Sequence, residues 1–225
     1  QLKLMQMAQL PFLGTNARAN SVALWRTYEK YFKVANEFKD VHLLAEMVIP
    51  TGSFYSLKGP IESERDLQGV KVWALPGVPA KLMTMAKAGV ISTPAAKMSE
   101  IIAGGMVDAF VGIPDMYAES FKVIRYAKSA TTVPGGLTTS SWSLIVNRQK
   151  WDSIPKRDQD IITKLSGEAF ADRMSAFDQV ESAAHAAAVK DGLKYQTASP
   201  QFVAELDKGA SVLRNEWLAS AKSEK

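Results

Sequence analysis

The sequence predicts an α/β fold of two lobes, and three observations carry this prediction. Apolar runs of strand length alternate with segments of helical periodicity along most of the chain. Residues 41–49 are almost continuously apolar, as in a strand buried on both faces of a parallel sheet. Residues 156–191 keep a helical pattern for roughly 35 residues, or about 50 Å, which is longer than most single domains need. We expect this long helix to bridge the two lobes.

The first long helix is expected over residues 16–38, because apolar side chains recur there at spacings of three and four. Residues 50–53 break the apolar run that follows and lead to a loop that holds Phe54 and Tyr55. Further helices are expected at 80–88, 96–104, 115–121 and 200–221. Further strands are expected at 90–93, 106–113, 123–128, 140–147 and 193–196.

The stretch 66–77 is the first candidate for a binding site. A polar turn that ends at Gly69 leads into a short strand. Pro76 and Gly77 end this strand before a helix begins. Ligands of open α/β sheets bind at the carboxyl ends of strands, beside the N-terminus of the next helix. We therefore expect Trp73 and the loop after it to line a pocket.

Composition excludes several classes of function. The chain has 225 residues, of which 47% are hydrophobic, so it can bury a substantial core. Its net charge of +4 is spread along the chain, which argues against nucleic acid as a partner. It has no cysteine, and no apolar run approaches the length of a membrane span. The opening residues 1–8 are interpreted as a processed or truncated start. We expect no cofactor, no metal and a monomer.

The sequence offers no convincing catalytic constellation. His42 and His185 have no carboxylate or second histidine at ligand spacing, so a structural or surface role is favoured for both. Asp108 and Asp115 lie seven residues apart around a strand end and could form an acid and base pair. A strand-end hydrogen bond for Asp108 and a helix N-cap for Asp115 are the favoured interpretations.

Aromatic residues are expected in loops or at strand ends, at Phe54, Tyr55, Trp73, Phe110 and Trp142. A single aromatic residue at such a position is more often packed in the core. Several of them near strand ends favour a ligand cleft.

Short motifs along nearly the whole chain resemble the solute-binding proteins of TRAP transporters, the DctP-like family. The matching residues are Leu10-Pro11-Phe12, Lys58-Gly59-Pro60-Ile61, Asp66-Leu67-Gln68-Gly69-Val70-Lys71-Val72, Gly105-Met106-Val107-Asp108, Val146-Asn147, Trp151 and Ile154-Pro155. The resemblance implies a periplasmic receptor of two α/β lobes that closes over a small organic solute and delivers it to TRAP membrane permease subunits. It also implies a further β/α segment upstream of the residues present here.

The anion-binding positions implied by the resemblance are altered. Trp73 stands where the family has an arginine that grips a carboxylate, and Gly112 stands near the position of its asparagine. Ala95, and Ser53 or Phe54, replace two more of its ligand residues. An organic acid stays possible, but these changes favour a less charged, more apolar or aromatic solute. Trp73→Ala is expected to weaken binding by about 1 to 3 kcal/mol at a nearly unchanged melting temperature.

The sequence thus predicts a non-enzymatic solute receptor that works by hinge closure. The first lobe is assigned to 1–68 with 142–175, and the second lobe to 69–141 with 176–225. The cleft is expected to be lined by Phe54, Trp73, Pro76, Phe110, Gly112, Thr139, Ser140 and Trp142. Two alternatives stay open: an α/β enzyme that uses Asp108 or Asp115, and a ligand-sensing subunit of a signalling system.

Overall fold

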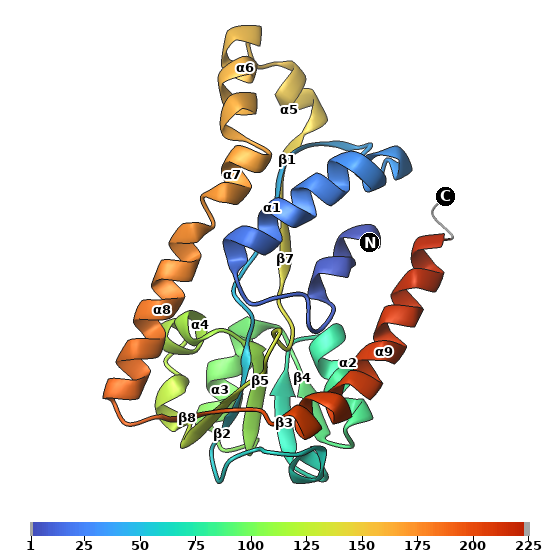
Figure 1. The fold of residues 1–225 in the computed structure, drawn as a ribbon. Helices are drawn as coiled ribbons and strands as arrows, with labels where there is room; N and C mark the ends of the chain where they lie inside the picture. The colour runs from blue at the N-terminus through green and yellow to red at the C-terminus, as the bar shows by residue number, and fades with distance from the viewer. Residues whose placement is uncertain (1, 223–225) are drawn as a thin grey trace.

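Two sheets divide the chain between a small lobe and a large lobe (Figure 1). The structure is a computed structural model that describes residues 2–222. In the small lobe, β1 (Val41–Val48) and β7 (Ser141–Asn147) form an antiparallel ribbon. The large lobe is built on a six-stranded sheet in the order β4, β3, β5, β2, β6, β8. The predicted two-lobed α/β fold is confirmed.

The element bounds are as follows. The strands of the large sheet are β2 (Ser53–Ser56), β3 (Lys71–Ala74), β4 (Gly89–Ser92), β5 (Ala109–Ile113), β6 (Ser129–Thr132) and β8 (Lys194–Thr197). The α-helices are α1 (Ala17–Thr27), α2 (Val78–Met85), α3 (Met98–Ala103), α4 (Asp115–Ser120), α5 (Arg148–Asp152), α6 (Lys156–Leu165), α7 (Glu168–Asp172), α8 (Ser175–Lys190) and α9 (Pro200–Lys222). Short 3-10 or π segments are η1 (Leu4–Gln9), η2 (Tyr28–Phe32), η3 (Lys33–Ala35), η4 (Glu64–Leu67), η5 (Ala95–Lys97) and η6 (Ile124–Tyr126).

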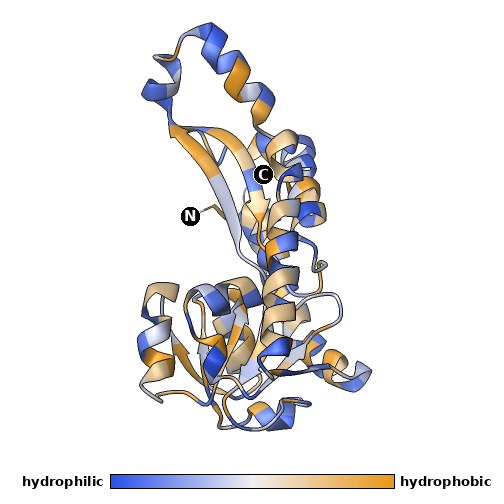
Figure 2. Cartoon of the chain, turned by 90° about the vertical axis from the view of Figure 1, so that its left-hand side faces the viewer, coloured by the Kyte–Doolittle hydropathy of each residue, from blue (hydrophilic) through white to orange (hydrophobic). Residues whose placement is uncertain are grey.

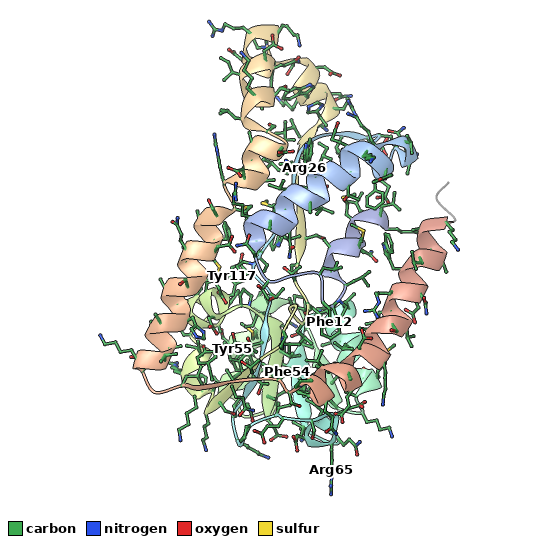
Figure 3. All side chains as sticks on the ribbon, viewed as in Figure 1. Phe12, Arg26, Phe54, Tyr55, Arg65 and Tyr117 are labelled. Carbon is green, nitrogen blue, oxygen red and sulfur yellow. The ribbon has the colours of Figure 1, made fainter. Side chains whose placement is uncertain are left out.

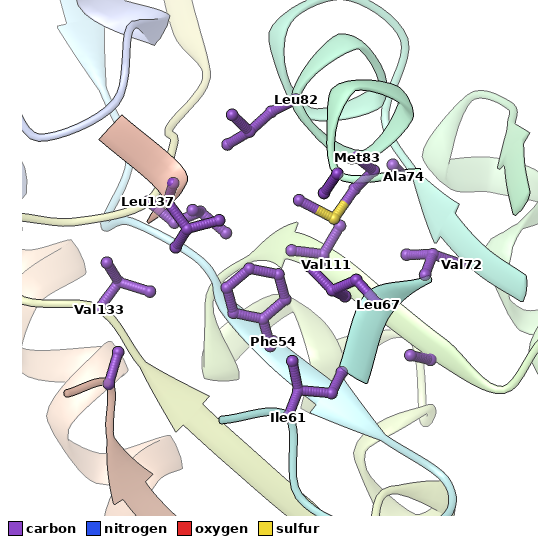
Figure 4. Close-up of a cluster of buried hydrophobic side chains, with 14 of the residues drawn as sticks. Phe54, Ile61, Leu67, Val72, Ala74, Leu82, Met83, Val111, Val133 and Leu137 are labelled. Carbon is purple, nitrogen blue, oxygen red and sulfur yellow. The ribbon is translucent and has the colours of Figure 1, made fainter. Parts of the chain in front are cut away.

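Helices cover both faces of the large sheet. On one face, Phe54 lies at the centre of an apolar cluster that includes Leu82 of α2 and Phe202 of α9 (Figure 4). On the other face, Trp73 packs in a second cluster with Ile102 of α3 and residues of α4 and α8. Strands β4, β3 and β5 run parallel to one another, whereas β2 runs antiparallel to both β5 and β6. The strand interiors of this lobe are therefore core.

Two expectations about strands 41–49 and 53–56 were wrong. The first is half of an antiparallel ribbon and not part of a parallel sheet, because an apolar run does not specify the direction of its partner. The second is strand β2 and not a loop. Its entry is so close to β5 that a Cβ on Gly52 would lie 2.3 Å from the backbone carbon of Gly112. Glycine at this position allows the start of β2 to lie against the end of β5.

Residues 123–128 were also predicted wrongly as a strand. Val123 and Ile124 are buried, but they belong to the turn before β6, and pairing begins only at Ser129. Burial of apolar side chains alone does not distinguish a packed turn from a strand.

The expected long helix is a run of three helices, α6, α7 and α8. Ser166 is extended and Gly167 has a φ of 60°, which interrupts the helix. The N–H of Gly167 donates to the carbonyl of Leu44 in β1 at 2.6 Å, and the ring of Trp25 covers this glycine. The run still bridges the lobes, since α7 and α8 contact α1 and α8 also contacts α4 (Figure 2).

The lobe boundaries stay a prediction, but residues 53–56, expected in the first lobe, pair with β5 and β6 of the six-stranded sheet. Ile61 and Leu67, also expected in the first lobe, pack in the core of the large lobe. The outermost parts of the two assigned ranges, residues 1 and 223–225, lie outside the described residues.

Gly167→Ala should lower the free energy of unfolding by about 1 to 3 kcal/mol in urea denaturation. A Cβ there would lie 2.8 Å from the Trp25 ring, and the positive φ adds strain. Gly192→Ala is the matched control, because its φ is also positive but no atom lies within 4 Å of the added Cβ. Equal losses at the two glycines would contradict a role for the Trp25 contact.

A buried carboxyl lies in the small lobe. Glu46 of β1 is fully buried, and the hydroxyl of Ser143 donates to its Oε1 at 2.8 Å. Its second oxygen has no hydrogen-bond partner among the described residues. Burial raises the pKa of Glu46 to about 7. A carboxyl with a raised pKa costs stability when it ionises, so the cost appears as the pH rises above about 4.5 and is complete above 7.

Glu46→Gln should therefore raise the free energy of unfolding by about 1 to 3 kcal/mol at pH 8 and by little at pH 5. Urea denaturation across this range measures the effect. The exposed Glu100→Gln serves as control and should change stability equally little at both pH values. A destabilised Glu46→Gln at pH 8 would show that the ionised carboxylate makes a favourable contact.

Candidate functional site

A groove opens where the two lobes meet. A cavity of about 300 Å³ is lined by Leu75, Pro76 and Pro79 from the large lobe and by the start of β7 from the small lobe. Gln9 of η1 completes its wall. A second hollow of about 610 Å³ shares Gln9 and Pro76 with this cavity and continues along α2 and α9. Together they form one surface, which we call the junction groove.

The large-lobe wall of the junction groove follows from the end of β3. The strand ends at Ala74, and Leu75 and Pro76 lead to Gly77, whose φ of 96° turns the chain into α2. Gly77 and Val78 line the second hollow, so the N-terminus of α2 faces it. A helix N-terminus favours negative charge, but here Pro79 has no N–H and the N–H of Ala80 donates to the carbonyl of Leu75 at 3.2 Å, so Val78 is the helical residue whose N–H is left for an anion. This wall therefore combines apolar prolines with a site suited to an anion.

The small-lobe wall lies on a segment that crosses between the lobes. Ser140 accepts a hydrogen bond from the N–H of Ile49 at 3.3 Å, and the hydroxyl of Thr139 donates to the carbonyl of Ile49 at 2.5 Å. The amide of Gln9 donates to the hydroxyl of Ser141 at 3.0 Å. Beyond them, 53% of Trp142 is exposed, which makes its indole the large aromatic surface of the smaller cavity.

Four predicted site residues meet in this groove: Pro76, Thr139, Ser140 and Trp142. Gly112 lies just behind the wall, because a Cβ on it would be 3.2 Å from Pro79. The sequence reasoning missed Gln9, Leu75, Pro79 and Ser141. The loop that follows β3 could have indicated Leu75 and Pro79, but no local signal places Gln9 against a residue 132 positions away.

Phe54, Trp73 and Phe110 were wrongly predicted to line the cleft. All three are at most 1% exposed. The indole N–H of Trp73 donates to the hydroxyl of Thr93 at 2.8 Å, and Phe110 stacks on Tyr55 with ring centroids 4.6 Å apart. These side chains lie in the middle of strands whose two faces are both covered, whereas the groove begins one residue after β3 ends.

The two aspartates do not form an acid and base pair. Asp108 accepts from the backbone N–H of Lys71 at 3.1 Å and pairs with Lys58, so the predicted strand-end role is confirmed. Asp115 was expected to be a helix N-cap, but it is not. Its carboxylate accepts a hydrogen bond from the hydroxyl of Tyr55 at 2.5 Å and is hydrogen-bonded to His185 at 2.8 Å. The two carboxylates lie at opposite ends of β5.

His42 stacks on Trp151 with ring centroids 3.8 Å apart, which is the structural role expected for it. Burial lowers the pKa of its imidazole. Within residues 2–222, no group of three acidic or histidine side chains is arranged to hold a metal ion. Over the same residues, no helix has both the length and the apolar content needed to cross a membrane.

Residues 2–219 match the family model for bacterial extracellular solute-binding proteins, family 7, named DctP. The chain is 45% identical over 223 residues to the outer membrane transporter protein TsaT of Comamonas testosteroni. This match covers 99% of the chain but only 66% of that relative's length.

Solved structures of TRAP solute-binding proteins are also similar to this chain. A TRAP periplasmic solute-binding protein of Bordetella bronchiseptica with bound (R)- and (S)-mandelate has a TM-score of 0.91 and 30% identity, over 100% of this chain and 71% of its own. A marine metagenome TRAP solute-binding protein specific for aromatic acid ligands, in complex with metahydroxyphenylacetate, has a TM-score of 0.89 and 25% identity. That match covers 98% of this chain and 70% of the other.

Trp73→Ala should lower the free energy of unfolding by about 3 to 5 kcal/mol, because it leaves a large cavity in the core and removes the partner of Thr93. Urea denaturation followed by circular dichroism measures this loss. Trp142→Ala is the control and should change the unfolding midpoint little, since half of its indole is already in solvent. A Trp73→Ala protein of unchanged stability would restore Trp73 as a ligand contact.

Proposed function

This chain belongs to family 7 of the bacterial extracellular solute-binding proteins, the DctP family, and we propose that it is a periplasmic TRAP receptor for small aromatic carboxylates. The family is one of solute receptors, which confirms the expectation that the chain is not an enzyme. The proposal adds that the solute binds in the junction groove, that the lobes close over it, and that a monomer delivers it to membrane permease subunits.

The exposed indole of Trp142 at the junction groove is the observation that carries the choice of solute. Its flat face is available for stacking or edge contact with a ring, and such aromatic pairs contribute about 0.5 to 1.5 kcal/mol beyond the burial of area. Leu75, Pro76 and Pro79 supply apolar surface opposite to it. The cavity of about 300 Å³ is at the lower end of the sizes seen for small-molecule sites.

A carboxylate on the same solute has donors within the groove. The amide of Gln9 and the hydroxyls of Ser140 and Ser141 lie on its small-lobe side, and the N-terminus of α2 lies on the other. A compound with one ring and one carboxylate matches this division better than a dicarboxylate does. The relatives that bind mandelate and aromatic acids support the same class of solute.

From the sequence, the aromatic surface was expected at Trp73, which is buried. The preference for a solute with a ring therefore rests on Trp142 and on the relatives. The solute is expected to be less charged than a dicarboxylate, but to carry one carboxylate.

Isothermal titration with mandelate, benzoate and succinate tests the proposal. We expect the two aromatic acids to bind and succinate to bind at least about tenfold more weakly, because succinate has no ring to contact Trp142. A tenfold ratio corresponds to about 1.4 kcal/mol. Tight binding of succinate with no binding of either aromatic acid would refute the proposed solute class.

Trp142→Ala should weaken binding of the aromatic acids by about 1 to 3 kcal/mol and leave the fold intact. Ile145→Ala is the matched control, because Ile145 lies on the same strand with 48% exposure but does not line the groove. Unaltered affinity of the Trp142 variant would place the solute elsewhere.

A further inference from the structure

The end of the large sheet that lies away from the small lobe carries a wide groove. β2 enters the sheet from the small lobe, so Ser56 and Lys58 lie at its far end (Figure 1). Figure 3 shows Tyr55 of the same strand inside the lobe, whereas nitrogen-tipped side chains extend from the lower edge of the lobe. A cavity of about 1040 Å³ opens there, which we call the distal groove. None of its lining residues lines the junction groove.

Three lysines come together in the distal groove because three neighbouring strands meet there. β6 runs antiparallel to β2 and parallel to β8, so the end of β2 lies beside the starts of the other two. Lys58 lies two residues after β2, Lys128 directly precedes β6, and Lys194 is the first residue of β8. Lys194 is also the register partner of Ser129, the first residue of β6. Strand pairing therefore holds three cationic residues side by side.

Two more cations line the groove from the turn that follows α4, at Lys122 and Arg125. Within the described residues 2–222, Lys58 is the one cation of these five that pairs with a carboxylate, that of Asp108. Two acidic residues, Glu119 and Asp191, complete the charged lining. The groove therefore has an excess of positive charge that the described side chains leave unneutralised.

A buried hydroxyl in the groove also lacks a partner. Ser129 lines the groove and is 7% exposed. Its hydroxyl makes no hydrogen bond to any described residue. A buried hydroxyl without a partner destabilises the fold, so an acceptor that enters the groove would relieve this cost. The oxygen of a bound anion is such an acceptor.

These donors suit a phosphate better than a carboxylate. The ammonium group of lysine is a point charge with three donors, whereas a planar carboxylate is matched best by the fork of an arginine. A phosphate has three strong acceptor oxygens and a charge of about −1.5 to −2. The cations of the groove come from the strand ends on one side and from the turn after α4 on the other. Donors on two sides fit a tetrahedral anion.

The rest of the groove suits an organic group. Ile124, Leu193 and Tyr195 add apolar and aromatic surface to the lining. The volume is far more than an inorganic phosphate fills, and it is at the upper end of the sizes seen for small-molecule sites.

We propose that the distal groove is a second binding site, for an organic phosphate. The phosphate binds Lys128, Lys194 and the hydroxyl of Ser129, and the organic part contacts Ile124 and Leu193. The site is separate from the junction groove and does not depend on the proposed solute. A soluble phosphate ester and the headgroup of a phospholipid share this chemistry, and the experiments below distinguish them.

Isothermal titration with glycerol 3-phosphate at low ionic strength tests the site, and glycerol is the neutral control. We expect the phosphate to bind and glycerol not to bind. Lys128→Gln and Lys194→Gln should each weaken binding about three- to tenfold, the effect of one lysine near a bound anion. Lys164→Gln is the matched control, because it removes the same charge from an exposed position on α6 and should keep the parent's affinity.

Ser129→Ala separates a ligand contact from a structural role. Because the hydroxyl has no partner in the free protein, its removal should keep or raise the melting temperature. The same change should weaken binding of glycerol 3-phosphate about three- to tenfold. Ser21→Ala is the control, since its buried hydroxyl is hydrogen-bonded to the backbone of Val48. That variant should lower the melting temperature and leave phosphate affinity unchanged.

Vesicles distinguish the two sources of phosphate. If the ligand is a phospholipid headgroup, the protein should sediment with vesicles of phosphatidylglycerol and not with those of phosphatidylcholine, and Lys194→Gln should reduce this. If the ligand is a soluble ester, glycerol 3-phosphate should bind and the protein should sediment with neither kind of vesicle.

Three results would overturn the distal site. They are binding of neither glycerol 3-phosphate nor phosphatidylglycerol vesicles, an equal loss of phosphate affinity in Lys164→Gln and Lys194→Gln, and displacement of glycerol 3-phosphate by mandelate. The last would place the phosphate in the junction groove, at the N-terminus of α2. If mandelate itself does not bind, the proposed solute is wrong, and the lysine variants still locate the phosphate.

Discussion

The large lobe depends on the covering of both faces of its six-stranded sheet by helices. Phe54 fills one face and Trp73 the other, each with almost no exposure. A strand buried on both faces offers no side chain to a solute, so binding surface can arise only at strand ends and in the segments between lobes. The junction groove, formed by the loop after β3 and the segment before β7, follows from this constraint.

The connections between the lobes run along one wall of the groove. The segment that leads from β1 to β2 runs beside the segment that leads from β6 to β7, and Gly52 donates to the carbonyl of Thr138 at 3.1 Å. Thr139 and Ser140 of the groove belong to this pair of segments. α8 is the third connection, held to both lobes through Asp178 and Glu181. A solute in the groove would therefore contact the backbone that connects the two lobes.

Two chemistries meet in the groove, and both suit an aromatic acid. The indole of Trp142 and the prolines provide apolar surface, while hydroxyls, an amide and the N-terminus of α2 provide donors. Family membership explains the receptor architecture, and the side chains that line the groove explain the proposed choice of solute. The buried carboxyls of Glu46 and Glu181, both with a pKa near 7, add a dependence on pH that neither the fold nor the groove requires.

The sequence by itself determined the alternation of strands and helices, the end of β3 at a proline and glycine, and the motifs of the solute-binding family. These features depend on neighbouring residues. Only the tertiary structure decided that Trp73 is core and Trp142 exposed, that Gly167 interrupts a continuous helical pattern, and that Glu181 and not Asp115 caps α4. The physical reason is that burial, strand pairing and capping are settled by partners tens of residues away, which no local pattern contains.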